Sequence, residues 1–101
     1  MKTDYQQEII TRIRILREKR GVTQLGLSRI LGISPGQMGN IDSAKQPHKF
    51  TIKQIVSICD FLGVNIEDVL FPGYQDKGTL TVRDVVNAII KYQDNEIQNQ
   101  K

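Results

Sequence analysis

The sequence predicts an all-α protein in which five short helices form one domain and a sixth, amphipathic helix follows. Two observations lead to this prediction. Apolar residues recur at intervals of three and four along most of the chain, which is the spacing that places side chains on one face of a helix. Residues typical of helix starts, such as Ser, Thr and Asn, precede these apolar series, and glycines follow them. The 101 residues are enough for one small domain.

The first helix is predicted over residues 4–19. Ile9, Ile13 and Leu16 recur at the spacing of one helical face and are expected to point into the core. Gly21 follows this helix, and glycine readily adopts the positive φ with which helices commonly end.

The next two helices are short and closely joined. The first of them, residues 24–31, follows Thr23 as its N-cap and ends before Gly32. The second, residues 35–43, follows Ser34 as its N-cap and has proline at its first helical position, where a missing backbone N–H costs nothing. Two helices joined by so short a turn form a helix-turn-helix.

Two more helices complete the predicted domain. The fourth helix is predicted over residues 51–63 and is closed by Gly63, and Thr51 and Gln54 have the spacing of a capping box at its start. Asn65 is the expected N-cap of the fifth helix, residues 66–70.

A polar linker, residues 73–80, separates this domain, residues 1–72, from a sixth helix predicted over residues 81–93. The apolar residues of the sixth helix form one continuous stripe: Val82, Val85, Val86, Ile89 and Ile90. An isolated helix of this length is marginal in water, so the stripe is expected to be buried, either against the domain or against the same helix of a second chain. The tail, residues 94–101, is polar and is expected to fray.

Positive charge is concentrated in the half of the chain that holds the two joined helices. Residues 1–53 carry a net charge of +6, whereas residues 54–101 carry −3. This asymmetry is typical of a surface that faces nucleic-acid phosphates. Solvated helices also carry Lys and Arg, but that alternative does not explain why the charge gathers in one half.

The sequence lacks the residue patterns of an enzyme, a metal site or a membrane protein. His48 is the only histidine and Cys59, the only cysteine, lies in an apolar helical series, so neither a catalytic set nor a group of metal ligands is predicted. There is no glycine-rich loop of the P-loop type. No apolar series approaches the ~20 residues of a membrane span, and the N-terminus has no hydrophobic signal region. We therefore expect a cytoplasmic, non-enzymatic protein without a cofactor.

Four segments resemble a known family. They are G-V-T-Q at residues 21–24, L-G-I-S at residues 31–34, T-I-K-Q-I at residues 51–55 and L-G-V-N-I-E-D-V-L at residues 62–70. In this order and at these spacings they are similar to the phage repressor/Cro-like (XRE-type) helix-turn-helix family. The resemblance implies a repressor-like domain that binds double-stranded DNA and places its third helix in the major groove.

The resemblance assigns base reading to the exposed side of the third helix. Its positions fall on five residues: Ser34, Pro35, Gly36, Gln37 and Asn40. Pro35 and Gly36 depart from the family pattern because they cannot hydrogen-bond a base through a side chain. Direct reading is therefore left mainly to Asn40 and Gln37, whose amides suit adenine.

Further positions are implied for phosphate contacts and for holding the third helix. Gln24 matches a phosphate-binding position at a helix N-terminus, and Lys45 and Lys49 follow the third helix where phosphate contacts are expected. Arg17 matches a position that pairs with an acidic residue, here Asp42, at the end of the third helix. A solvated arginine is the alternative.

Two functions follow from the resemblance. The first is a transcriptional regulator, a repressor, that binds a palindromic operator as a homodimer. The alternative is an antitoxin-like or co-regulatory module whose last helix binds another protein, such as a toxin or a co-regulator. Pairing of the last helix with its copy is favoured over folding back, because two half-sites require two reading helices about one DNA turn, ~34 Å, apart.

Overall fold

The computed structural model of the protein describes residues 2–71 and 80–99, with side chains described as far as Gln93. Within these ranges the chain forms no strand and six helices: α1 (Asp4–Lys19), α2 (Gln24–Leu31), α3 (Pro35–Asp42), α4 (Ile52–Leu62), α5 (Ile66–Leu70) and α6 (Val82–Asn99). The all-α fold class predicted from the sequence is confirmed.

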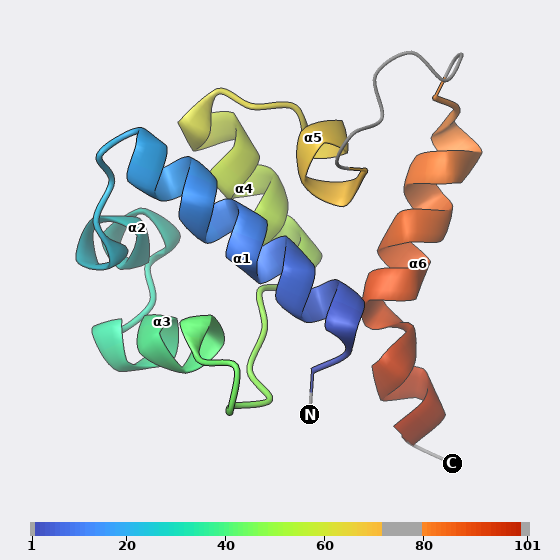
Figure 1. The fold of residues 1–101 in the computed structure, drawn as a ribbon, viewed down its shortest axis with the longest axis horizontal. Helices are drawn as coiled ribbons and strands as arrows, with labels where there is room; N and C mark the ends of the chain where they lie inside the picture. Colours follow the sequence, from blue (N-terminus) through green and yellow to red (C-terminus); the bar gives the residue numbers. More distant parts are fainter. Residues whose placement is uncertain (1, 72–79, 100–101) are drawn as a thin grey trace.

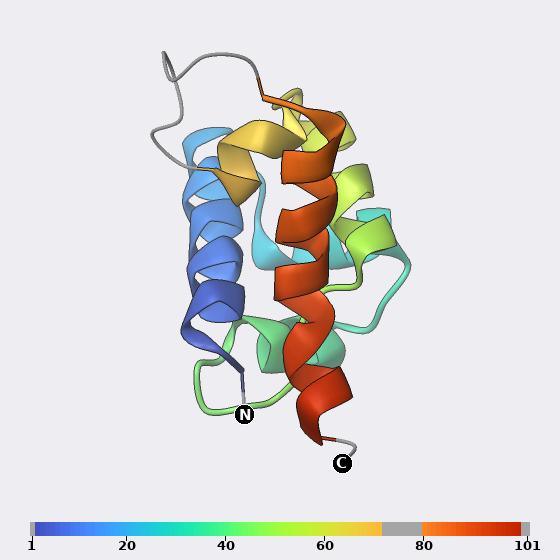
Figure 2. The same ribbon diagram turned by 90° about the vertical axis from the view of Figure 1, so that its right-hand side faces the viewer.

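The long helix α1 is the centre of the arrangement (Figure 1). Helices α2 and α3 lie toward one end of the molecule and α6 stands at the other, while α4 and α5 complete the layer behind and beside α1. The view from the α6 side shows α6 across that side of the molecule, with α1 to its left and α4 to its right (Figure 2). The molecule measures 38 × 38 × 19 Å. Helices α3 and α6 lie at different ends of it (Figure 1).

The core is built from residues of every helix. Its fully buried aliphatic and aromatic side chains include Ile9, Ile10, Ile13, Leu27, Met38, Phe50, Ile55, Ile58, Val69 and Tyr92. Ile9, Ile10 and Ile13 come from α1, so this helix is covered on more than one side. Burial of this apolar surface supplies most of the stability, at roughly 25 cal/mol per Å².

The helix ends largely follow the sequence prediction. Gly32 and Gly63 end α2 and α4 in the left-handed conformation, with φ of 70° and 69°. Thr51 and Gln54 form the predicted capping box. Asn65 occupies the predicted N-cap position of α5, although its side chain makes no cap hydrogen bond.

Helix α6 folds back onto the domain, which is the alternative that the sequence did not favour. Ala88 and Tyr92 are buried, with exposed fractions of 6% and 1%. The Tyr92 hydroxyl donates to the carbonyl of Phe50 (2.9 Å), and the buried Gln6 amide of α1 donates to the carbonyl of Tyr92. Ala88 and Tyr92 form the docking face together with Val85 and Ile89 of the predicted stripe. The sequence prediction missed Ala88 and Tyr92 because neither is a large aliphatic residue.

The predicted apolar stripe of α6 is divided by this docking. Val85 and Ile89 are half-buried against the core. Val82, Val86 and Ile90 remain 81%, 45% and 49% exposed. One edge of α6 thus holds the helix to the domain, and a neighbouring edge leaves large apolar side chains in solvent.

The end of α6 differs from the prediction. The helix runs to Asn99, past the predicted end at residue 93, so residues 94–99 are helical instead of frayed. No glycine or proline interrupts this part of the sequence, which gives the helix no stop signal. The predicted linker, residues 73–80, lies outside the described residues apart from Leu80, as do residues 100–101.

None of the described helices is both long enough and apolar enough to span a bilayer.

Candidate nucleic-acid interface

The turn between α2 and α3 is fixed by local hydrogen bonds. Thr23 caps α2 by accepting from the Gly26 N–H (2.9 Å). After Gly32, the Ile33 N–H donates to the carbonyl of Ser28 (3.0 Å), which closes the end of α2. Ser28 is buried, and its hydroxyl donates to the carbonyl of Leu25 (2.6 Å), so this polar group is satisfied.

Two apolar residues set the rotation of α3. Met38 and Ile41 are 1% and 6% exposed and attach α3 to the core. The five predicted base-reading residues are all exposed: Ser34, Pro35, Gly36, Gln37 and Asn40. The helix therefore presents to solvent an exposed edge that carries the polar side chains of Ser34, Gln37 and Asn40, as a reading helix requires.

Ser34 and Gln37 are engaged in a capping box that the sequence reading missed. The Ser34 hydroxyl accepts from the Gln37 N–H (3.0 Å), and the Gln37 side-chain oxygen accepts from the Ser34 N–H (3.3 Å). The S-x-x-Q spacing would have revealed it. Asn40 differs, because its side chain forms no hydrogen bond to any described residue. Among the predicted base-reading side chains, Asn40 is thus the one whose donor and acceptor are both available.

The glycines of α3 are not required by the packing of the domain. Both have ordinary negative φ, since the described positive-φ glycines are Gly21, Gly32 and Gly63. A Cβ at Gly39 would meet nothing within 4 Å, and one at Gly36 would lie 3.9 Å from the Ser34 hydroxyl. Each glycine costs the helix about 1 kcal/mol relative to alanine. Because Gly36 has no side chain, the backbone of the first turn is uncovered at this exposed position.

Asp42 links α3 to the first two helices. Its carboxylate lies 3.8 Å from the Arg17 guanidinium and accepts a hydrogen bond from the Gln24 amide (2.7 Å). Arg17 is buried, not solvated, and also donates to the carbonyl of Val22 (2.8 Å). The side chains of Arg17 and Asp42 are only 8% and 10% exposed, so the pair is weakly screened by solvent.

Gln24 is less available for phosphate than its position implies. One hydrogen of its side-chain amide is given to Asp42, whose negative charge lies directly beside it. A phosphate contact would have to use the second amide hydrogen or the free backbone N–H groups at the start of α2.

The two predicted lysines differ in their surroundings. Lys45 is exposed in the loop after α3. Lys49 is half-buried and lines a hollow of about 290 Å³ between α3 and the start of α4, together with Gln37, His48 and Thr51. Lys45 is therefore the better-placed cation for a passing phosphate.

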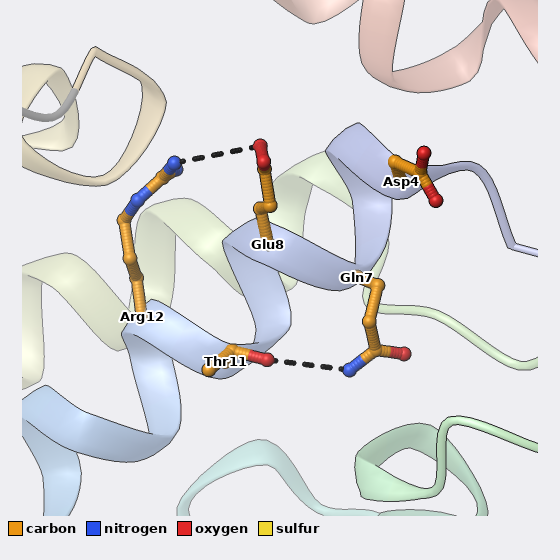
Figure 3. A pocket seen from close by; sticks show the side chains of 5 residues that line it. All are labelled: Asp4, Gln7, Glu8, Thr11 and Arg12. Carbon is orange, nitrogen blue, oxygen red and sulfur yellow. Dashed lines mark hydrogen bonds and ion pairs between the residues drawn. The ribbon is translucent and has the colours of Figure 1, made fainter.

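A second hollow, of about 500 Å³, lies over α1, and the described residues that line it all belong to that helix (Figure 3). Arg12 and Glu8 point to one side of it and form an ion pair of 3.8 Å, while the Gln7 amide donates to Thr11 on the other side. Arg12 also donates to the carbonyl of Val69 (2.6 Å) and so ties α1 to α5. The polar side chains around this hollow are thus engaged in contacts that stabilise α1 and its packing on α5, and they do not point to a ligand site.

Cys59 is a core thiol. It is 4% exposed within α4, and burial, assisted by the negative charges of Asp68 and Glu67, raises the pKa of this thiol to about 11. A thiol with so high a pKa carries almost no thiolate at neutral pH and is unreactive.

A helix-turn-helix with an exposed polar second helix, held to the core by two apolar residues and followed by an exposed lysine, defines the protein as a DNA-binding one. The family model of the Cro/C1-type HTH DNA-binding domain matches residues 12–71, and the chain belongs to this family. Comparison with curated proteins and with solved structures gave no match.

Proposed function

We propose that the protein is a cytoplasmic, sequence-specific transcriptional repressor that binds a palindromic operator as a homodimer, with α3 in the major groove. The observation that carries this proposal is the outer edge of α3. It is exposed along its length, and its opposite side is anchored in the core by Met38 and Ile41.

Affinity and specificity come from different residues in this proposal. Lys45, with the backbone N–H groups at the start of α2, neutralises phosphates and releases counterions. Asn40 reads a base through its free amide, with adenine as the natural partner. Gln37 contributes through its remaining amide hydrogens, because its oxygen is engaged with Ser34. Ser34, Pro35 and Gly36 shape the approach to the groove.

The homodimer is proposed to form through the exposed edge of α6. Val82, Val86 and Ile90 are spaced four residues apart and share one face. A two-fold axis at Val86 would set Val82 of one chain against Ile90 of the other, so the edge is complementary to itself.

The dimer is tested by sedimentation of the Val86→Lys variant beside an Arg83→Gln control on the same helix. Val86→Lys should convert a dimer to a monomer and weaken operator binding, whereas the control should stay dimeric. A wild-type protein that is monomeric alone and on DNA would exclude the homodimer. That result would favour the alternative function, in which the protein is an antitoxin-like or co-regulatory module and the exposed edge of α6 binds another protein.

The operator is tested by selecting bound fragments from a random DNA pool. The proposal expects a two-fold symmetric motif. It also expects affinity for that motif to fall steeply with salt concentration, in proportion to the number of phosphate contacts. Recovery of no motif, with salt-insensitive binding, would contradict sequence-specific regulation.

A further inference from the structure

The C-terminal end of α3 is held by cations from the beginning of the chain. The Lys2 ammonium donates to the carbonyls of Ile41 and Ser43, both at 2.6 Å. The Arg14 guanidinium donates to the carbonyl between them, that of Asp42, at 2.8 Å. Three successive backbone carbonyls therefore each accept a hydrogen bond from a positively charged side chain.

Helix α3 needs such a cap because its own sequence supplies none. The last carbonyls of any helix lack partners within the helix, and the aligned peptide dipoles leave a partial negative charge there. The last turn of α3 contains no basic residue. With only eight residues and two glycines, α3 has low intrinsic stability. The cations of residues 2 and 14 supply the missing charge from outside the helix.

The environment of Lys2 agrees with a fixed side chain. Lys2 is half-buried, and desolvation lowers the pKa of its ammonium group, as does the nearby charge of Arg14, while Asp42 opposes this shift. The ammonium donates to two backbone carbonyls at the end of α3 and is attracted by the nearby negative charge of Asp42. Both hydrogen bonds of the Lys2 ammonium go to backbone carbonyls, so they hold the helix independently of the side chains on its outer edge.

We propose that Lys2 and Arg14 are positioning residues for DNA reading, which fix the angle at which α3 enters the major groove by capping its C-terminal carbonyls. Lys2 lies outside residues 12–71, the segment that matches the family model, so this contact is an addition to the matched domain. The inference rests on the proposed function of α3 as the reading helix.

The experiment compares operator affinity for Lys2→Met, Lys2→Arg and a control, Lys19→Met, at a temperature where all are folded. Lys19 is exposed at the end of α1, so the control removes the same charge without the same contacts. Lys2→Met should weaken specific binding by about tenfold, as expected for charge-assisted hydrogen bonds. The slope of affinity against salt should not change. Lys2→Arg should restore binding, and Lys19→Met should stay within about twofold of the wild type.

A variant of similar stability separates positioning from general destabilisation. Ile58→Val removes one buried methylene from α4 and should leave affinity unchanged at the same temperature. A salt slope that becomes shallower by about one unit in Lys2→Met would show a direct phosphate contact and overturn the proposal. Equal affinities for Lys2→Met and wild type would overturn it as well.

Amide hydrogen exchange tests the cap without DNA. Lys2→Met should speed exchange in the last turn of α3, at Gly39, Asn40 and Ile41, and not in α4. Unchanged exchange would contradict the cap itself. If exchange is faster in Lys2→Met but the wild-type protein shows no sequence preference for DNA, the cap would be supported and only the reading function would be contradicted. The two failures can therefore be told apart.

Discussion

Helices α3 and α6 stand at opposite ends of the molecule, and both are held by residues from the start of the chain (Figure 1). Lys2 donates to the last carbonyls of α3, and Gln6, one turn further on, donates to the carbonyl of Tyr92 in α6. The two helices differ in what they leave exposed: α3 presents a polar edge and α6 an apolar one. The same manner of attachment therefore serves two surfaces with different chemistry.

The largest expected effect of a substitution concerns the polar attachment of α3. Asp42→Ala should lower the free energy of unfolding by about 3 kcal/mol, because it leaves the buried Arg17 guanidinium without its carboxylate and removes the partner of Gln24. Denaturant unfolding measures the change. Glu18→Ala is the matched control, since Glu18 lies 4.0 Å from the same guanidinium but is 62% exposed. The control should change stability by less than about 0.5 kcal/mol, and equal losses in both variants would show that Asp42 has no special role.

A smaller effect is expected at the attachment of α6. Tyr92→Phe removes the buried hydroxyl that donates to Phe50 and leaves that carbonyl unpaired, so it should cost about 1–2 kcal/mol. Tyr5→Phe removes the less buried hydroxyl that donates to Leu70 at 3.2 Å and should cost less. Thermal unfolding of the two variants ranks them, and the reverse order would mean that α6 is not held through Tyr92.

The glycines of α3 give the smallest change in stability. Gly36→Ala and Gly39→Ala should each raise the free energy of unfolding, by at most about 1 kcal/mol, since neither new Cβ meets a close contact. Gly36 lies on the outer side of the first turn, so Gly36→Ala should also weaken operator binding if the helix backbone approaches the DNA there. Denaturant unfolding and operator binding of both variants check this, and stabilisation without any loss of binding at Gly36 would exclude a close backbone approach.

Most of the fold could be predicted because its signals are local. Thr23, Ser34 and Thr51 precede helices as caps, and Gly32 and Gly63 follow them, so the positions of α2, α3 and α4 were predicted nearly to the residue. The contacts that hold α3 and α6 are different, because they join residues far apart in sequence. Lys2 and Ile41 are 39 residues apart, and Gln6 and Tyr92 are 86 apart. Nothing in the local pattern around Lys2 or Gln6 indicates those partners.

The candidate site was predictable to a similar extent. The exposed edge of α3 follows from the burial of Met38 and Ile41, which are three residues apart in an otherwise polar helix. The engagement of Gln24 with Asp42 was not predictable, because both residues also have plausible separate roles. The Ser34–Gln37 capping box was visible in the sequence as S-x-x-Q, and its presence makes Asn40 the clearest candidate for base reading.

The central claim, that the outer edge of α3 reads base identity, is tested most directly by binding of Asn40→Ala to the selected operator and to each of its single-base variants. The account predicts that the substitution erases the preference at one base step in each half-site, while the dependence of affinity on salt stays that of the wild type. Lys45→Ala should instead weaken binding to every sequence and lower the salt slope by about one unit. A uniform loss on all sequences in Asn40→Ala, indistinguishable from that of Lys45→Ala, would contradict the account.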